Sequence, residues 1–289
     1  MHTIASATSH AHPAAHAATS PRVWFITGAS RGLGRALTAA VLAEGDRVVA
    51  TARDVTPLAA LCAEYEGALF AFPLDVSDRA AVFAGVERAV GEFGRLDVVV
   101  NNAGGVLFGM TEEVTEEQAR AHFDTNFFGA LWVSQAVLPH LRARGSGHLL
   151  QMSSMGSAGG FASVGLYSAG KAALDAMSEG LAMELEPFGV KVTILQPGGY
   201  ATDLFTLGLT ATEEREEYAP LRAELAEMWG GAVDAAPEKA APVIREVAAM
   251  EHPPKRVLLG GLAFDQVRQL DQARAAEWAR WEELSRRAD

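Results

Sequence analysis

Apolar residues occur along the chain in two alternating patterns, short continuous runs and helical spacing. The runs predict strands at 22–27, 46–51, 68–76, 96–104, 147–154, 190–199 and 255–261. Helical spacing predicts helices at about 31–44, 56–66, 78–93, 115–143 and 163–187. Strands that are apolar throughout are buried on both faces, and alternation of strand and helix produces a parallel sheet with right-handed crossovers. We therefore predict a doubly wound α/β fold, a parallel sheet of about seven strands with helices on both faces.

A single domain is expected over residues 21–265. Its segment at about 203–250 has helical spacing interrupted by acidic and Gly/Pro-rich stretches, which is typical of a substrate lid with short helices of its own. Residues 266–289 are predicted to form an amphipathic helix. We expect its apolar stripe to pack against the domain or a partner subunit rather than to bind a cofactor; the stripe consists of Leu270, Trp278, Trp281 and Leu284.

Residues 1–20 have the composition of a leader rich in Ala, Ser and His. They lack the basic start and the continuous apolar stretch of a signal peptide. We predict a disordered segment outside the fold. Short His-rich tracts also bind metal ions, and that alternative stays open for the leader. No metal site is expected within the fold.

The charge and cysteine content narrow the functional classes. A net charge of −12, from 36 acidic and 24 basic residues, argues against nucleic-acid binding and against a polybasic membrane anchor. No apolar run reaches the roughly 20 residues that span a bilayer. A single cysteine, Cys62, fits a small apolar filler and a reducing cytoplasm. Arginine far outnumbers lysine and alanine is abundant, which is typical of a GC-rich bacterial gene.

A glycine-rich turn, "TGASRGLG" at 27–34, lies between the first predicted strand and the first helix. Gly28 permits the tight turn, Gly32 lets a diphosphate approach the backbone, and Gly34 allows close packing of helix on strand. The helix N-terminus supplies N–H donors and a favourable dipole. The spacing G-x-x-x-G-x-G differs from the usual G-x-G-x-x-G, but the strand–turn–helix context indicates a Rossmann-type dinucleotide site.

The end of the second predicted strand bears on the choice of dinucleotide. An acidic residue near this position binds the adenosine ribose of NAD, whereas the chain has Arg53, and Arg31 lies within the glycine turn. Two guanidinium groups suit a 2′-phosphate. We therefore expect NADP(H) to be preferred over NAD(H). Asp54 follows directly, so a shift of two residues would reverse the preference.

Two further motifs follow in order, "NNAG" at 101–104 and Tyr167-x-x-x-Lys171. Together with the glycine turn they resemble the short-chain dehydrogenase/reductase family, in its branch with the Thr-Gly-x-x-x-Gly-x-Gly turn. The resemblance runs from about residue 22 to 203. It implies an oxidoreductase with a catalytic set of Ser154, thirteen residues before the tyrosine, with Tyr167, Lys171 and Asn126.

The resemblance and the glycine turn also imply which residues contact the cofactor. Asn102, Ala103 and Gly104 are expected beside the adenosine, Asp75 and Val76 beside the adenine, and the segment from Pro197 over the nicotinamide. The full expected set is Gly28, Ser30, Arg31, Gly32, Leu33, Arg53, Asp75, Val76, Asn102, Ala103, Gly104, Tyr167, Lys171, Pro197, Gly198 and Thr202.

Hydride transfer to a carbonyl leaves an alkoxide that needs a proton. We hypothesise that Tyr167 supplies it, with Lys171 on the same helix face lowering the pKa of the phenol and binding the nicotinamide ribose. Ser154 would hydrogen-bond the carbonyl oxygen, and Asn126 would hold a water that relays protons to Lys171. Alternatively, the Tyr–Lys pair is a solvated surface contact, Asn126 a helix-bending polar residue, and Ser154 a simple strand end.

Three positions depart from the family pattern. Gly170 precedes Lys171 where serine is common, Gly105 extends the "NNAG" motif, and Gly199–Tyr200 replaces a frequent apolar pair. Glycine inside a helix costs about 1 kcal/mol relative to alanine. Gly170 is therefore the departure that most needs an explanation.

These observations predict an NADP(H)-dependent oxidoreductase acting on a carbonyl or secondary alcohol. The expected substrate is apolar and medium-sized, because the lid carries Phe205, Leu207, Leu209, Tyr218, Leu221 and Trp229. The alternative is a non-catalytic protein that senses NADP(H). A nucleotide-sugar epimerase or dehydratase is disfavoured by the glycine spacing and the short C-terminal region. By resemblance, helices 115–143 and 163–187 pair between subunits, so we expect a homodimer or homotetramer.

Overall fold

The computed structural model describes residues 20–231 and 233–289. The predicted leader lies outside the described residues except for Ser20, so its disorder and its alternative as a metal-binding tract stay predictions. Within the described part of the chain, no helix is long and apolar enough to cross a bilayer, and no group of three or more metal-ligating side chains is found.

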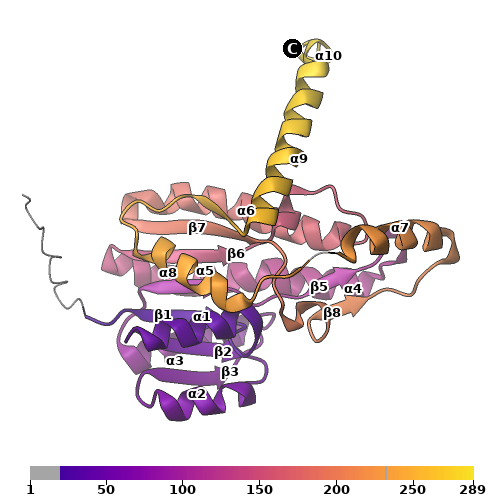
Figure 1. Ribbon diagram of the computed structural model, residues 1–289. Helices are drawn as coiled ribbons and strands as arrows, with labels where there is room; N and C mark the ends of the chain where they lie inside the picture. The colour runs from indigo at the N-terminus through magenta and orange to yellow at the C-terminus, as the bar shows by residue number, and fades with distance from the viewer. Residues whose placement is uncertain (1–19, 232) are drawn as a thin grey trace, which may run out of the picture.

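A seven-stranded parallel sheet forms the centre of the molecule, as predicted (Figure 1). The strand order is β3-β2-β1-β4-β6-β7-β9. The strands are β1 (Val23–Thr27), β2 (Arg47–Ala52), β3 (Leu69–Pro73), β4 (Val98–Asn101), β6 (Gly147–Met152), β7 (Val190–Pro197) and β9 (Arg256–Leu259). The order reverses between β1 and β4, and ligands of such sheets bind beyond the carboxyl ends of the strands at that switch point.

Helices cover both faces of the sheet because the side chains of each strand alternate between two core clusters. In β1, Trp24 and Ile26 belong to one cluster, whereas Val23 and Phe25 belong to the other. The first cluster is closed by α1 (Gly32–Ala43), α2 (Ala59–Glu64) and α8 (Ala240–Ala249), and the second by α3 (Arg79–Phe93), α5 (Gly129–Arg144) and α6 (Gly165–Leu185).

The segment expected to form a lid, 203–250, ends in a helix that belongs to the core. Ile244 and Val247 of α8 are buried in the same cluster as Leu37 and Val41 of α1. Spacing of three and four residues places Ala240, Ala241, Ile244 and Val247 on one face, which explains this packing. The part before α8 contains β8 (Leu209–Ala211) and α7 (Ala219–Trp229), and β8 pairs with β5 (Val106–Phe108) in a small parallel sheet.

Glu113 anchors the lid segment to the body of the domain. Its buried carboxylate accepts hydrogen bonds from the backbone N–H of Met110 at 2.8 Å and of Arg215 at 2.9 Å. The hydroxyl of Thr212 donates to it at 2.9 Å, and Arg222 forms an ion pair with it. These donors, the Arg222 guanidinium above all, hold the pKa of Glu113 at about 2, so the carboxylate stays ionised at neutral pH.

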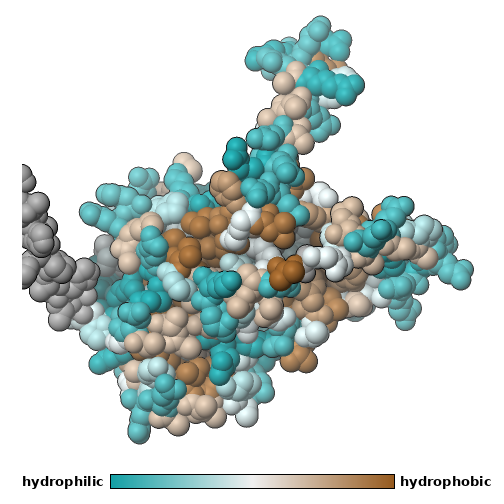
Figure 2. Space-filling model, in the orientation of Figure 1, coloured by the Kyte–Doolittle hydropathy of each residue, from teal (hydrophilic) through white to brown (hydrophobic). Residues whose placement is uncertain are grey.

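The C-terminal helices α9 (Gly261–Arg280) and α10 (Glu282–Arg286) extend away from the domain (Figure 1), and Figure 2 shows them as mainly hydrophilic. Ala263 and Val267 in the first turns are buried, whereas Trp278 is 68% exposed and Trp281 48% exposed. Of the expected stripe, Leu270 contacts the domain, since a Cβ on Gly160 would lie 3.2 Å from its side chain, whereas the two tryptophans stay exposed. The contact of α9 with the body extends to Arg274, which donates a hydrogen bond to the Ala158 carbonyl oxygen, and the rest of the roughly 30 Å helix projects beyond it. Packing on a partner subunit stays a prediction.

Candidate active site

Tyr167 and Lys171 lie one turn apart near the start of α6, which packs against the end of β6. Lys171 Nζ is 6.0 Å from the centre of the Tyr167 ring and donates a hydrogen bond to the Met152 carbonyl oxygen at 2.9 Å. The side chain is buried, and Lys171 is only 4% exposed. The pair is therefore not a solvated surface contact.

Ser154 lies two residues after the end of β6, close to Tyr167. Its hydroxyl oxygen accepts a hydrogen bond from the Gly156 N–H at 3.0 Å, and the hydroxyl group lies beside the Tyr167 phenol, whose pKa it lowers. A Cβ atom on Gly156 would lie 3.3 Å from Ser154 Oγ and 3.6 Å from Tyr167 Cε1. Gly156, which sequence reasoning missed, thus lets the loop after β6 approach both hydroxyl groups.

Asn126 lies in a π-helical turn, Asp124–Phe128, between α4 (Glu116–Phe123) and α5. The helix predicted at 115–143 is thus present as one helical stretch over 116–144, and the π turn changes its hydrogen-bonding pattern at 124–128. Asn126 is 2% exposed, and its Oδ1 accepts from the Gly105 N–H at 3.3 Å. A Cβ on Gly104 would lie 2.8 Å from that Oδ1 and 3.4 Å from Lys171 Nζ. Glycine at 104 thus brings the "NNAG" backbone between Asn126 and Lys171.

Burial sets the pKa values of the tyrosine and the lysine. It raises the pKa of Tyr167, although the hydrogen bond with Ser154 acts in the opposite direction. The pKa of the phenol thus moves opposite to the expected lowering by Lys171, because removal from water disfavours the phenolate. Burial lowers the pKa of Lys171 to about 8, partly offset by the charge of Asp175. At neutral pH the phenol is neutral and able to donate a proton, and the lysine is mostly an ammonium ion.

The pKa of Lys171 predicts a pH dependence. We expect kcat for carbonyl reduction to fall as the pH rises through about 8, because the ammonium charge is lost. In the unfolded chain the pKa of this lysine is near 10.5. Between about pH 8 and 10.5 the unfolded chain therefore binds more protons than the folded chain, and the contribution of Lys171 to the free energy of unfolding rises with pH. Measurement of kcat and of the thermal unfolding temperature over the same pH range checks both the fall in kcat and the rise in stability. If activity is lost only where the protein unfolds, deprotonation of Lys171 is not the cause of the fall in kcat.

The glycine turn after β1 is held against the "NNAG" segment. Gly28 and Gly32 have φ values of +64° and +51°, which favour glycine. A Cβ on Gly28 would lie 2.8 Å from Ala103 Cα, and Asn102 Nδ2 donates to the carbonyl oxygens of Thr27 at 2.9 Å and Gly28 at 3.0 Å. Asn102 therefore fixes the turn through its side chain and does not merely provide a backbone wall.

The first turn of α1 presents free backbone donors. Arg31 at the N-cap has extended backbone, and its side chain makes no capping hydrogen bond among the described residues. The leading amides of such a helix, together with its dipole, favour an anion. The turn therefore fits the diphosphate of a dinucleotide.

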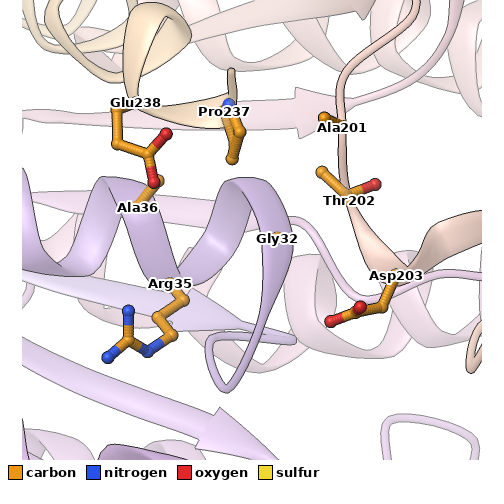
Figure 3. A pocket seen from close by; sticks show the side chains of 8 residues that line it. All are labelled: Gly32, Arg35, Ala36, Ala201, Thr202, Asp203, Pro237 and Glu238. Atoms are coloured by element: carbon orange, nitrogen blue, oxygen red, sulfur yellow. The ribbon is translucent and has the colours of Figure 1, made fainter. Parts of the chain in front are cut away.

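A pocket of about 370 Å³ opens beside this turn (Figure 3). One wall comes from α1, with Gly32 and Arg35, and another from the loop after β7, with Thr202 and Asp203. A Cβ on Gly32 would lie 3.2 Å from the Thr202 methyl group, so the loop and the turn are in close contact. Arg35 is a cationic lining residue that sequence reasoning missed, although its place in the first turn of the helix was the available signal.

Arg53 is exposed directly after β2, whereas Asp54 is engaged in its own turn. The Thr56 side chain, and then the Thr56 N–H that donates to the Asp54 carboxylate at 2.9 Å, lower the pKa of Asp54. In the same way, Asp75 accepts from the N–H and hydroxyl of Ser77, at 3.0 and 2.7 Å. Both side chains are exposed at this strand end, and one oxygen of the Asp54 carboxylate is engaged by Thr56.

The remaining predicted cofactor residues are placed as follows. Val76 is buried beneath the first residue of α5, and Ser30 and Leu33 are partly exposed in the turn and at the start of α1. Pro197 ends β7, and a Cβ on Gly198 would lie 3.1 Å from the Ala263 Cβ. Gly198 therefore has a packing role against α9 besides any contact with a cofactor.

Comparison with known proteins agrees with this geometry. Residues 22–211 match the short chain dehydrogenase family, and the chain belongs to that family of oxidoreductases. "Oxidoreductase BOA17" of Botryotinia fuckeliana is 36% identical over 268 residues, 91% of this chain and 98% of that protein. A 3-ketodihydrosphingosine reductase of Bacteroides thetaiotaomicron is 36% identical over 252 residues, 84% of this chain and 89% of that protein.

Solved structures show the same relationship. A short-chain dehydrogenase from Streptomyces avermitilis is 40% identical, with a TM-score of 0.88, and covers 93% of this chain and 100% of its own. An alcohol dehydrogenase from Thermococcus sibiricus, complexed with 5-hydroxy-NADP, is 27% identical, with a TM-score of 0.70, and covers 83% of this chain and 96% of its own. The chain is thus an oxidoreductase with the fold of this family.

Proposed function

We propose that the protein transfers a hydride between NADP(H) and a carbonyl or secondary alcohol. The observation that carries this proposal is the convergence of Ser154, Tyr167, Lys171 and Asn126 beyond the carboxyl ends of β4 and β6. A protein that only sensed the dinucleotide would have no use for a buried acid–base set. Turnover of NADPH with a panel of ketones, steroids, quinones and sugars tests the proposal.

The bound nicotinamide supplies the hydride; the chain supplies the proton and the electrostatics. Ser154 donates a hydrogen bond to the carbonyl oxygen, where negative charge develops. Tyr167, held neutral by its raised pKa, donates its proton to the same oxygen. Lys171 holds a positive charge near the phenol and binds the ribose, and Asn126 holds a water that connects Lys171 to solvent.

The proposed preference for NADP(H) is supported by Arg31 and Arg53, and by the engagement of Asp54 with Thr56. We expect Arg53→Ala to lower kcat/KM for NADPH by about 10-fold or more, because a charge-assisted contact contributes about 1.5–3 kcal/mol. The value for NADH should change by less than about twofold. Arg47→Ala, at the exposed start of β2, is the matched control. A tenfold preference of the wild-type protein for NADH would contradict the assignment.

The proposed substrate is an apolar carbonyl compound of medium size. Phe205 and Leu207 of the lid segment are 54% and 73% exposed, and Trp229 packs edge-on against Phe108 at 6.3 Å. The name of the Bacteroides relative, a 3-ketodihydrosphingosine reductase, supports an apolar ketone. We propose that the lid segment before α8 contacts this substrate.

We further propose a cytoplasmic homodimer or homotetramer built through α5 and α6. Phe128, beside α5, is 36% exposed, and Met183 of α6 is 70% exposed. Apolar side chains in such positions suit a helix–helix contact between subunits.

A further inference from the structure

We propose that His122 is a positioning residue of the active site: its ring holds the Asn126 side chain in one orientation, and Gly170 makes room for that ring. The proposal rests on the oxidoreductase function proposed above. His122 lies in the last turn of α4, one turn before Asn126, and is 7% exposed. No motif of the sequence singled it out.

The contacts of the Asn126 side chain divide between its two ends. Nδ2 donates to the His122 carbonyl oxygen at 3.0 Å and lies 3.2 Å from His122 Nδ1. Oδ1 accepts from the Gly105 N–H at 3.3 Å. A flipped amide would set its oxygen against the His122 carbonyl oxygen and its NH₂ group against the Gly105 N–H donor. The histidine therefore determines that the oxygen end of Asn126 faces the Gly104–Gly105 backbone.

This arrangement requires one tautomer of the histidine. An amide NH₂ group only donates, so Nδ1 must accept and carry no proton, and the proton of the neutral ring is on Nε2. The groups facing the ring are Lys171 and Tyr167 on α6, besides Asn126 itself. Burial, and then the Lys171 charge, lower the pKa of His122 to about 4, so the ring is neutral at pH 7.

Gly170 explains how a histidine fits beneath α6. A Cβ on Gly170 would lie 3.3 Å from His122 Nε2, closer than most side-chain contacts, and 4.0 Å from the Asn126 Cβ. Within the described part of the chain Nε2 has no hydrogen-bond partner, and the ring packs edge-on against Tyr167 at 6.0 Å between centroids. The glycine that departs from the family pattern thus compensates for a large side chain at 122.

The consequence for catalysis passes through Asn126. Its Oδ1 and the Lys171 ammonium both lie within 3.4 Å of the point that a Cβ on Gly104 would occupy. An amide free to rotate would turn its NH₂ group toward this ammonium and lose the Gly105 contact. His122 therefore acts on the reaction by fixing a neighbour of Lys171 and does not touch the substrate.

Two substitutions separate this role from simple packing. His122→Phe keeps a ring without an acceptor, and we expect kcat to fall about 5- to 10-fold, as loss of one hydrogen bond predicts. His122→Gln keeps an acceptor and should recover at least half of the wild-type kcat. KM for NADPH should change less than about twofold in both. His148→Gln is the matched control, because it replaces another buried histidine, at the start of β6. It should change stability and leave kcat unchanged.

A double-mutant cycle with Asn126→Ala tests whether the effect passes through the asparagine. In that background His122→Phe should lower kcat less than about twofold. An equal loss in both backgrounds, or a glutamine variant as slow as the phenylalanine variant, would overturn the proposal.

The tautomer of His122 can be measured on the wild-type protein, independently of the folding and activity of the variants. ¹⁵N NMR of the His122 ring at neutral pH should show an unprotonated Nδ1 and a protonated Nε2. A proton on Nδ1, or a cationic ring, would overturn the proposal even in an active enzyme. The expected tautomer in a protein that reduces no carbonyl compound would instead refute the proposed function and leave the hydrogen bond in place.

Discussion

The Tyr167→Phe variant is expected to bind NADPH normally and to reduce carbonyl substrates about 10²–10⁴-fold more slowly than the wild-type protein. The substitution removes one oxygen atom, which carries the proton in the proposed mechanism, and leaves the ring that packs against His122. The raised pKa of Tyr167 keeps the phenol neutral, so the loss should be of similar size across neutral pH. Single-turnover rates and NADPH fluorescence titration measure the two properties separately.

Tyr65→Phe, at the end of α2, is the matched control and should retain wild-type rates. It removes the same phenolic hydroxyl group at a site that is several strands away from β6 in the sheet. Unchanged turnover of Tyr167→Phe, with NADPH still bound, would falsify the role of the tyrosine as proton donor.

Ser154→Ala is expected to lower kcat by about 10²–10³-fold, the usual cost of removing one donor to a developing oxyanion. The variant also removes the hydrogen bond that lowers the pKa of Tyr167, so the phenol becomes a still weaker acid. NADPH affinity should stay within about twofold, because the proposed contact of Ser154 is with the substrate oxygen and not with the cofactor.

Ser146→Ala, at the exposed position just before β6, is the matched control, because it removes a serine hydroxyl at the opposite end of the same strand. A Ser154→Ala variant with a raised KM and an unchanged kcat would show that the hydroxyl contributes to substrate binding alone. That outcome would contradict its proposed role in the transition state.

The sequence predicted the central sheet well because its strands are buried on both faces, which leaves continuous apolar runs such as Val98–Val100. It did not predict β5 and β8, whose three residues each are too short to carry a period. The role of α8 was also missed, since its apolar stripe is compatible with a lid or a core helix until α1 is seen beside it. The π turn at Asp124–Phe128 has no compositional signal of its own.

The site was predicted where spacing along one element carries the information. The interval between Tyr167 and Lys171 is one helical turn, and the glycine turn follows a strand directly. His122 and Gly156 were missed because their importance comes from contacts across elements. The pKa of Tyr167 was predicted with the wrong sign because burial of the phenol cannot be read from the spacing of two residues.

Transfer of deuterium from NADPH labelled at nicotinamide C4 tests the central claim most directly. The wild-type protein should place the label on the carbinol carbon of an alcohol product, as detected by NMR, and Tyr167→Phe should do so only at its residual rate. NADPH that binds but passes no label to any ketone, steroid, quinone or sugar would contradict hydride transfer to a carbonyl. That result would favour a protein that senses NADP(H) without turning it over.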